Sequence, residues 1–292
     1  MSIKKEINKI AINLKLFYNH LLGYTLIYPP QGMGDILILA LGMEEYKKIN
    51  NNPKVAFIVH KKHFVNLCRI FSENIDKIIF INKTPKKMPK YVINVSDRTY
   101  GVQAHFDRFE RALLDAIGIN KELSSFQHPK IRQFIKIEQL FKNTFIKGKT
   151  VLITPEATTS LNCVPNNYWI TLADKLKTKG YIPVFNSKRK YGEYENILLS
   201  LEETINFADL AGNVLGLRSG INDVLACFSS AYQVIIYPNN WQKGDMPYLN
   251  GFDEDPNKRY MEDGSLSRLY PNKKFVEFIY DEKIDPTSFF GE

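Results

Sequence analysis

The chain has 292 residues, of which 44% are hydrophobic and 24% are charged. This length suits two ordinary domains, and the composition is that of a folded globular protein, which excludes a disordered chain. The formal net charge of +8 favours anionic partners such as nucleotides, phosphorylated glycans or a membrane surface. We expect no nucleic-acid partner.

Three features of the sequence bear on compartment and metal content. The three cysteines are odd in number and far apart, which suits a reducing compartment better than a disulfide framework. No Cys or His pair has the spacing of zinc ligands, so we expect no metal site. No apolar run reaches transmembrane length, and the N-terminus lacks the apolar region of a signal peptide. We therefore expect a cytoplasmic protein.

The opening 23 residues are expected to form an amphipathic helix. Their apolar residues alternate in spacings of four and three, which places one stripe on a helix face: Ile3, Ile7, Ile10, Leu14, Phe17 and Leu21. Lysines flank this stripe, and a loop over residues 83–90 adds four more lysines. The stripe either packs on the protein itself or on another helix, or it lies on an anionic membrane or a phosphorylated lipid-linked glycan.

Strands and helices then alternate along the chain. The expected strands are residues 24–28, 55–59, 77–81, 91–95, 150–154, 181–185, 214–217 and 233–237. The expected helices are residues 36–49, 64–71, 105–117, 167–179, 197–210 and 220–229.

This alternation predicts the α/β class, with two Rossmann-like domains built on parallel sheets. The N-terminal domain is expected over residues 1–148 and the C-terminal domain over residues 149–292. We expect the two domains to face each other across a cleft, because ligands of such sheets bind at the carboxyl ends of the strands.

The first candidate motif is the glycine turn after the first strand, which contains Gly32, Gly34 and Asp35. Glycines there let backbone amides approach an anion at the start of the next helix. The third glycine of a dinucleotide fingerprint is absent, and His60 stands where a ribose-binding acid is expected. The structural alternative is a tight turn in which Asp35 caps the helix.

The second motif, residues 155–160, follows the first strand of the second half. Glu156, Thr158 and Thr159 lie in it, and its hydroxyls and amides could bind a diphosphate. The alternative is a polar capping loop.

The third motif runs from Gly216 to Asp223, where a strand enters a glycine turn and a helix. Arg218 could bind phosphate through two parallel hydrogen bonds, beside Ser219 and the amide of Gly220. The alternative is an Arg218–Asp223 ion pair that stabilises the turn.

Together these motifs resemble the bacterial family 9 glycosyltransferases, the heptosyltransferases of lipopolysaccharide assembly, which have a GT-B fold. The resemblance rests on Gly34-Asp35 at a helix start, on Ala157-Thr158-Thr159 with Trp169 downstream, and on the Ser219-Gly220 turn before Tyr237-Pro238. Residues 105–118 also resemble the helix that closes the family's first domain. The resemblance implies that Asp35 is the general base and that the threonines and the later glycine turn bind the phosphates of a nucleotide sugar.

The chain departs from the family at two places. The family's Asp-x-Gly-x-x-His turn runs here from Arg218 to Asp223, with a cation in place of the acid and an acid in place of the histidine. The family's lysine after the threonine pair is replaced by residues 161–163, Leu-Asn-Cys. These changes imply that the donor is not read as the family reads ADP-heptose.

The sequence therefore predicts a glycosyltransferase without a cofactor, which uses a nucleotide sugar as donor and an anionic glycan or lipid-linked molecule as acceptor. Asp35 would take the acceptor proton in an inverting reaction without a metal. The residues expected to bind the donor are Gly32, Gly34, Glu156, Thr158, Thr159, Arg218, Ser219, Gly220 and Asp223. The protein would be cytoplasmic, at the inner face of the inner membrane. Two alternatives remain open: a sugar-nucleotide epimerase or hydrolase of the same fold, and an inactive sugar-binding or scaffold protein.

Overall fold

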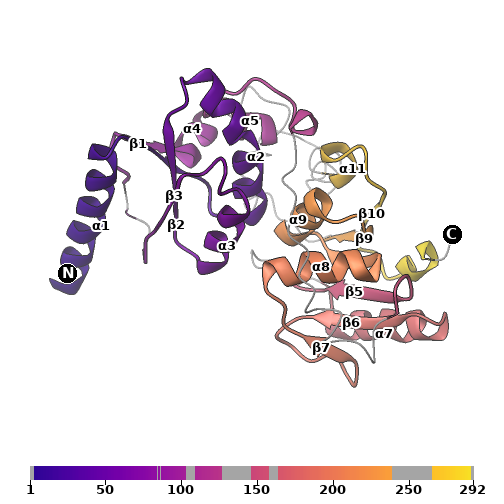
Figure 1. Cartoon of the computed structure of the whole chain (residues 1–292). Helices are drawn as coiled ribbons and strands as arrows, with labels where there is room; N and C mark the ends of the chain where they lie inside the picture. Colours follow the sequence, from indigo (N-terminus) through magenta and orange to yellow (C-terminus); the bar gives the residue numbers. More distant parts are fainter. Residues whose placement is uncertain are drawn as a thin grey trace. The chain divides into compact units, whose positions relative to one another are not determined.

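The computed structural model describes residues 3–83, 85, 87–102, 109–126, 146–157, 164–238 and 265–290. The chain divides into two compact units, Met1–Pro129 and Lys130–Glu292. The sequence analysis placed the start of the C-terminal domain at residue 149, and this boundary stays a prediction because residues 127–145 lie outside the described ranges. Each unit is built on a parallel sheet of its own (Figure 1).

The sheet of the first unit has four parallel strands in the order β3-β2-β1-β4. The strands are β1 (Tyr24–Tyr28), β2 (Lys54–Val59), β3 (Lys77–Phe80) and β4 (Val92–Asn94). β1 pairs on one side with β2 and on the other with β4, where Tyr28 lies opposite Asn94. β1 and β2 are nearly continuous apolar runs because helices cover the sheet on both faces.

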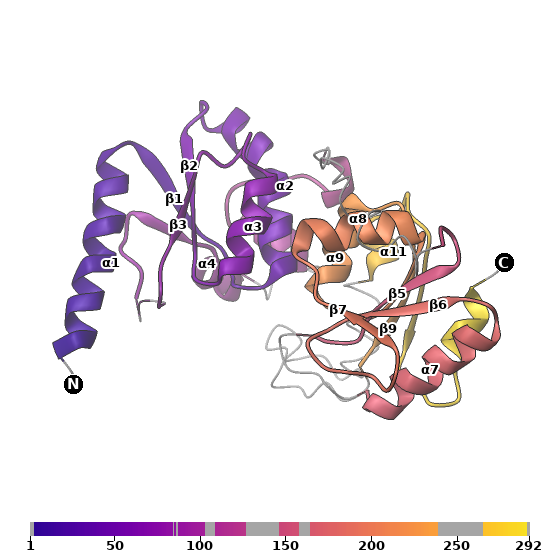
Figure 2. The same cartoon turned by 60° about the horizontal axis from the view of Figure 1, so that its bottom comes forward.

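Helices of the first unit form a layer on each face of this sheet (Figures 1 and 2). One face is covered by α1 (Ile3–Leu21), whose Leu16 is fully buried in the cluster that contains Leu26 and Ile58. The other layer contains α2 (Met33–Ile49) and α3 (Lys62–Ile70), followed by α4, α5 and a short 3-10 helix: Val95–Val102, Phe109–Asp115 and Leu123–Ser125.

The amphipathic helix was predicted correctly, but its apolar stripe does not pack on the protein. Ile7, Ile10, Leu14, Phe17 and Leu21 are all exposed, while Leu16 faces the sheet. The expectation that the stripe packs on the protein itself is therefore wrong. Within the described residues, no helix is both long and apolar enough to cross a membrane.

Three other expectations for the first unit need correction. The helix after β1 begins at Met33 rather than at residue 36, because the Gly32 carbonyl accepts the Ile36 amide at 3.1 Å. The strand expected to run to residue 95 ends at Asn94, and Val95 opens α4. The helix expected over residues 105–117 is α5, from Phe109 to Asp115, and residues 103–108 lie outside the described ranges.

The sheet of the second unit has six parallel strands in the order β10-β9-β8-β5-β6-β7. Numbered from the start of the unit this is 6-5-4-1-2-3, the strand order of Rossmann dinucleotide-binding folds. The strands are β5 (Thr150–Thr154), β6 (Ile182–Asn186), β7 (Glu195–Ile197), β8 (Asn213–Leu217), β9 (Tyr232–Tyr237) and β10 (Phe275–Ile279).

Helices lie on both faces of the second sheet as well. One face packs on α7 (Asn166–Thr178) and on the 3-10 helix Pro286–Phe289, around the fully buried Trp169 and Phe185. The other face carries α8 (Leu201–Ala211), α9 (Gly220–Phe228) and α11 (Leu266–Leu269) (Figure 1).

The helix expected over residues 197–210 begins later, at Leu201, because Ser200 caps it. The Ser200 hydroxyl accepts the Glu203 amide at 3.3 Å, and the Glu203 carboxylate accepts the Ser200 amide at 2.8 Å. Gly212 ends the helix with φ of 77°, a left-handed conformation that favours glycine. Strands β7 and β10 were not predicted.

Candidate functional site

The strand order of the second unit defines where a ligand is expected. Parallel α/β sheets bind ligands outside the carboxyl ends of their strands, at the point where the strand order reverses. In this sheet that point lies between β5 and β8, which pair with Thr154 opposite Gly216. The second and third sequence motifs leave from these two strand ends, so the fold brings them together.

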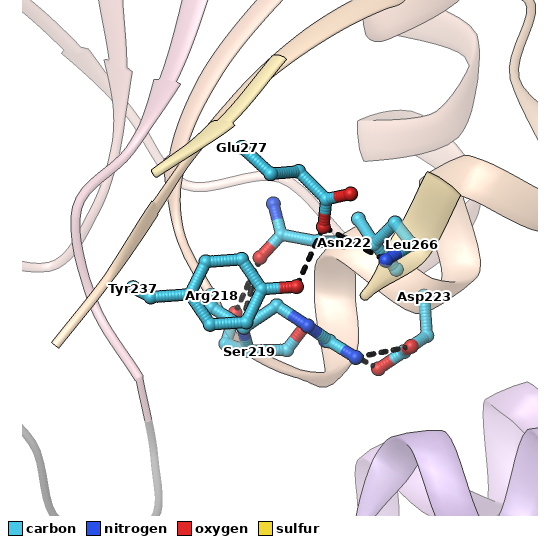
Figure 3. A network of polar contacts seen from close by, with 7 residues as sticks. All are labelled: Arg218, Ser219, Asn222, Asp223, Tyr237, Leu266 and Glu277. Carbon is cyan, nitrogen blue, oxygen red and sulfur yellow. Dashed lines mark hydrogen bonds and ion pairs between the residues drawn. The ribbon is translucent and has the colours of Figure 1, made fainter. Parts of the chain in front are cut away.

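The turn after β8 is organised by Asn222, in the first turn of α9. The side-chain oxygen of Asn222 accepts the backbone amide of Ser219 at 2.8 Å and the Ser219 hydroxyl at 3.3 Å (Figure 3). Ser219 is the N-cap residue of α9, so the side chain of Asn222 reaches back over the start of its own helix. The first amides of a helix have no partner within it and point along the positive end of its dipole. This turn can therefore bind an anion.

Two buried polar atoms face this turn without a hydrogen-bond partner among the described residues. They are the hydroxyl oxygen of Thr154 and the amide nitrogen of Asn222, on side chains that are 4% and 0% exposed. Both approach the Cα of Gly216 closely, and a methyl group there would lie 2.7 Å from the Asn222 nitrogen. A buried polar atom without a partner costs about 1–3 kcal/mol, so its retention points to a ligand.

Arg218 and Asp223 form a buried ion pair at the same turn (Figure 3). The two terminal nitrogens of Arg218 each donate to one carboxylate oxygen of Asp223 at 2.8 Å, and one of them also donates to the Ser219 carbonyl at 3.0 Å. The two residues are 7% and 6% exposed. The structure thus contains the ion pair that the sequence left as an alternative, and phosphate binding by Arg218 stays a prediction.

Glu277 of β10 joins three elements beside this turn. Its carboxylate accepts the Tyr237 hydroxyl at 2.6 Å and the Leu266 amide at 2.8 Å (Figure 3). It also accepts the amide and the hydroxyl of Ser267. Because Tyr237 ends β9 and Leu266 begins α11, Glu277 fixes the carboxyl edge of the sheet next to α9.

The second motif is described only in part. Glu156 lies at 3.4 Å from Arg189, in an ion pair in which both side chains are partly exposed. Thr158 and Thr159 lie outside the described residues, so their expected role stays a prediction.

The corresponding position of the first unit lies between β1 and β4, and the first motif leaves from it. Gly32 is the N-cap residue of α2, and Asp35 lies in the first helical turn with its carboxylate against the Cα of Gly32. The N-cap residue of this helix is therefore Gly32 and not Asp35, as the structural alternative had it. A side chain at residue 32 would collide with this carboxylate, so glycine gives Asp35 room.

Gln31 and His60 follow β1 and β2 at the same edge of the sheet. The side-chain nitrogen of Gln31 donates to the Pro29 carbonyl at 2.7 Å. The side-chain oxygen of Gln31 accepts the backbone amide of His60 at 3.1 Å, and this bond joins the ends of β1 and β2. Burial lowers the pKa of His60, and the charge of Lys61 lowers it further. His60 is therefore neutral at pH 7, and Asp35 is the acidic group of the first motif.

The sequence analysis missed four residues at these two sites: Gln31, Asn94, Thr154 and Asn222. Asn94 ends β4 opposite Tyr28, and its side-chain oxygen is buried without a partner among the described residues. Asn222 had a signal, because Ser219-x-x-Asn222 has the spacing of a capping box. Within the described part of the chain, no group of three or more His, Cys, Asp or Glu residues is placed to hold a metal ion.

The similarities of this chain to known proteins lie in the fold and not in the sequence. No family model matches the sequence, and no curated protein is significantly similar to it. Among solved structures, a glycosyl transferase family 9 protein from Veillonella parvula superimposes with a TM-score of 0.52 and 11% identity, over 88% of this chain and 86% of that one. The Escherichia coli heptosyltransferase WaaC, solved with ADP, gives a TM-score of 0.51 and 11% identity, over 87% and 93%.

These similarities define the class of the fold. The chain has two Rossmann-like units of the GT-B type, as the sequence predicted. In particular, its fold resembles that of the family 9 glycosyltransferases and heptosyltransferases.

Proposed function

We propose that this protein is a glycosyltransferase, which moves a sugar from a nucleotide-sugar donor to a cell-surface glycan or a lipid-linked acceptor. The observation that carries the proposal is the pair of buried polar atoms, on Thr154 and Asn222, at the strand-order reversal of the second unit. The fold similarity to WaaC, which was solved with ADP, supports a nucleoside diphosphate as the ligand of this unit.

The donor diphosphate binds at the start of α9 in this mechanism. The amide of Gly220 and the hydroxyl of Ser219 face the phosphates, and the Asn222 nitrogen and Thr154 hydroxyl supply further polar contacts. Thr158 and Thr159, which follow β5 in the sequence, bind the same phosphates in this proposal. Fixed donors of this kind stabilise the charge that develops on a departing diphosphate, so the reaction needs no metal.

Asp35 is the general base. Its carboxylate takes the proton of the acceptor hydroxyl, the hydroxyl oxygen bonds to the anomeric carbon of the sugar, and the bond from that carbon to the diphosphate breaks. The nucleoside diphosphate leaves from the face opposite the attack, so the configuration of the sugar is inverted.

The acceptor belongs to the assembly of a bacterial surface polysaccharide such as lipopolysaccharide or capsule. We place the enzyme in the cytoplasm, peripherally at the inner face of the inner membrane, because lipid-linked acceptors are held there. The excess of positive charge supports an anionic acceptor.

The proposal is tested by incubating the full chain with a panel of nucleotide sugars, with and without an extract of lipid-linked glycans. We expect one donor to release its nucleoside diphosphate only when acceptor is present, equally well with a chelator, and NMR of the product to show inversion. Release without acceptor would make the protein a hydrolase, and binding of donors without any turnover would make it a sugar-binding protein.

Variants of β5 test the donor site directly. Thr154→Val removes the buried hydroxyl at constant shape, so we expect the affinity for the nucleoside diphosphate to fall about fivefold to tenfold while stability is unchanged or higher. Thr150→Val is the matched control at the opposite end of the strand. Its hydroxyl bonds to the Ile146 backbone at 3.1 Å, so this variant loses stability but keeps its affinity. Equal affinities in Thr154→Val and the wild type would place the donor elsewhere.

A further inference from the structure

The outer face of α1 is an apolar surface that the protein leaves uncovered. Ile7, Ile10, Leu14, Phe17 and Leu21 are between 48% and 66% exposed, and they follow each other at spacings of three and four along one side of the helix. We call these five residues the outer stripe. Spacings of this kind place side chains in a single row on the helix surface.

The inner face of α1 is held firmly on the sheet, so the stripe is presented in a fixed orientation. Leu16 is fully buried and Ile12 packs on the same cluster, while the Lys15 ammonium donates to the carbonyl of Phe80, the last residue of β3, at 2.9 Å. Exposure of the outer stripe is therefore not caused by a loose helix. Figures 1 and 2 show α1 along the outer side of this sheet.

The loop between β3 and β4 extends this surface. Its residues Pro89 and Tyr91 line a groove of about 430 Å³ together with Ile10, Leu14 and Phe17 of α1. The Tyr91 ring stacks on the ring of His20 with centroids 4.7 Å apart and lies 6.2 Å from that of Phe17. The loop and the helix thus form one continuous apolar face, with the stacked rings of His20 and Tyr91 at its side.

The exposed charged side chains described beside this face are positive. Lys9, Lys83, Lys87 and Lys90 are exposed there, and residues 7–34 and 77–96 contain no Asp or Glu, although Glu6 directly precedes the stripe. An apolar stripe beside exposed lysines is typical of helices that lie in the interface of a bilayer containing anionic lipids.

A second copy of the chain fits this face less well. If the outer stripe formed the a and d positions of a coiled coil, the e positions would be Ala11 and Tyr18, and the g positions Glu6, Asn13 and His20. Glu6 is the one charged residue in this set, and the set contains no Lys or Arg that could form a pair of opposite charge with it. Two copies would also bring the lysines of one face towards those of the other, and like charges oppose association.

We propose that the outer stripe of α1 and the described residues of the following loop (82, 83, 85 and 87–91) form a docking surface for an anionic lipid bilayer. The helix lies in the headgroup region with its stripe towards the acyl chains, and the lysines contact lipid phosphates. This inference goes beyond sugar transfer and does not rest on it, because vesicle binding needs neither donor nor acceptor.

Vesicle flotation of the full chain tests the proposal. We expect binding to vesicles of phosphatidylcholine mixed with phosphatidylglycerol, weaker binding at high salt, and little binding to phosphatidylcholine alone. Leu14→Asp combined with Phe17→Asp should lower the affinity at least tenfold without a change in melting temperature, because both side chains are exposed. Ile49→Asp, which replaces another exposed apolar residue of the same unit, is the control and should bind like the wild type.

The charge contribution is tested in the same assay. Lys87→Gln with Lys90→Gln should weaken binding about 25-fold, since each lysine near an anionic leaflet contributes about fivefold. Lys177→Gln with Lys188→Gln removes two exposed lysines of the second unit and should change binding less than about twofold.

Three results would overturn the proposal. Equal binding to neutral and anionic vesicles would remove the role of the lysines, and vesicle binding unaffected by the stripe variants would move the surface elsewhere. If sedimentation instead shows a dimer that Leu14→Asp with Phe17→Asp converts to monomer, and the wild type ignores vesicles, the face belongs to a second copy. Loss of transfer with intact vesicle binding would leave this inference standing and reject only the proposed function.

Discussion

Removing one partner of the Arg218–Asp223 pair should destabilise the second unit strongly. Both side chains are nearly buried and are joined by two hydrogen bonds of 2.8 Å, so Asp223→Ala leaves the guanidinium buried without a counter-charge. Breaking a pair of this kind costs about 3–5 kcal/mol. In a unit of this size 1 kcal/mol corresponds to about 2–4 °C, so we expect the melting temperature to fall by about 10 °C.

A double variant separates the ion pair from simple loss of packing. Arg218→Met with Asp223→Leu replaces the buried charges by apolar side chains and should recover at least half of the lost stability, because such replacements are often neutral. Urea unfolding of the wild type, Arg218→Met, Asp223→Leu and the double variant measures this cycle.

A single variant of Arg218 separates its two candidate roles, the structural ion pair and phosphate binding. Arg218→Lys keeps the charge and loses the two-pronged contact, so a structural pair predicts lower stability with an unchanged affinity for the nucleoside diphosphate. An affinity at least tenfold lower at unchanged melting temperature would refute this reasoning and show that Arg218 binds phosphate instead.

Three further predictions concern single residues. Asp35→Asn should lower the transfer rate about 10²–10⁴-fold while calorimetry shows unchanged donor binding, and wild-type turnover would end its role as base. Gly216→Ala places a methyl group 2.7 Å from the Asn222 nitrogen, so urea unfolding should show a loss of about 1–3 kcal/mol together with weaker nucleotide binding, whereas wild-type stability would contradict this close approach. Burial alone would raise the pKa of Asp76, but the contacts of its carboxylate with Lys47 outweigh burial and lower this pKa. The carboxylate therefore stabilises the fold at pH values above the pKa of Asp76 in the unfolded chain. This stabilisation is lost as the pH falls through the lower pKa of the folded protein. Asp76→Asn should therefore cost about 1 kcal/mol at pH 7 and progressively less below about pH 4, and a cost independent of pH would contradict it.

In the second unit, the strands that the sequence predicted are the interior strands, whose side chains are mostly buried on both faces. Strand Thr150–Thr154 is wholly buried, and the interior strand Tyr232–Tyr237 is nearly so. Each therefore consists mainly of apolar and β-branched residues, a pattern from which the sequence alone predicts a strand. The two missed strands lie at the edges of the second sheet. Glu195–Ile197 is only three residues long, and Phe275–Ile279 carries Glu277 at its centre, so neither has the hydrophobic pattern of a buried strand.

The candidate sites were predictable as loops but not as sets of contacts. Glycines and polar residues after strands indicate a ligand site at the carboxyl edge, and the strand order agrees with that expectation. Two alternatives at Arg218 could not be separated from the sequence, because the choice depends on how deeply its side chain is buried. The role proposed for Thr154 could not be predicted for another reason. In the sequence Thr154 is an ordinary β-branched strand residue, and only the pairing of β5 with β8 places it opposite Gly216.

The exchange of charges at the turn before α9 changes which groups are left to bind a donor. In the family that this chain resembles, the turn has an acid at the position of Arg218 and a histidine at that of Asp223. Here the two residues neutralise each other, so the turn offers a ligand no net charge from these side chains. In the proposed reaction we therefore expect the diphosphate to be held by backbone amides and by uncharged atoms such as the Asn222 nitrogen, which bind through geometry rather than through long-range attraction. We expect such a site to select its donor by the position of the phosphates, with the pair of Arg218 and Asp223 keeping the turn in place.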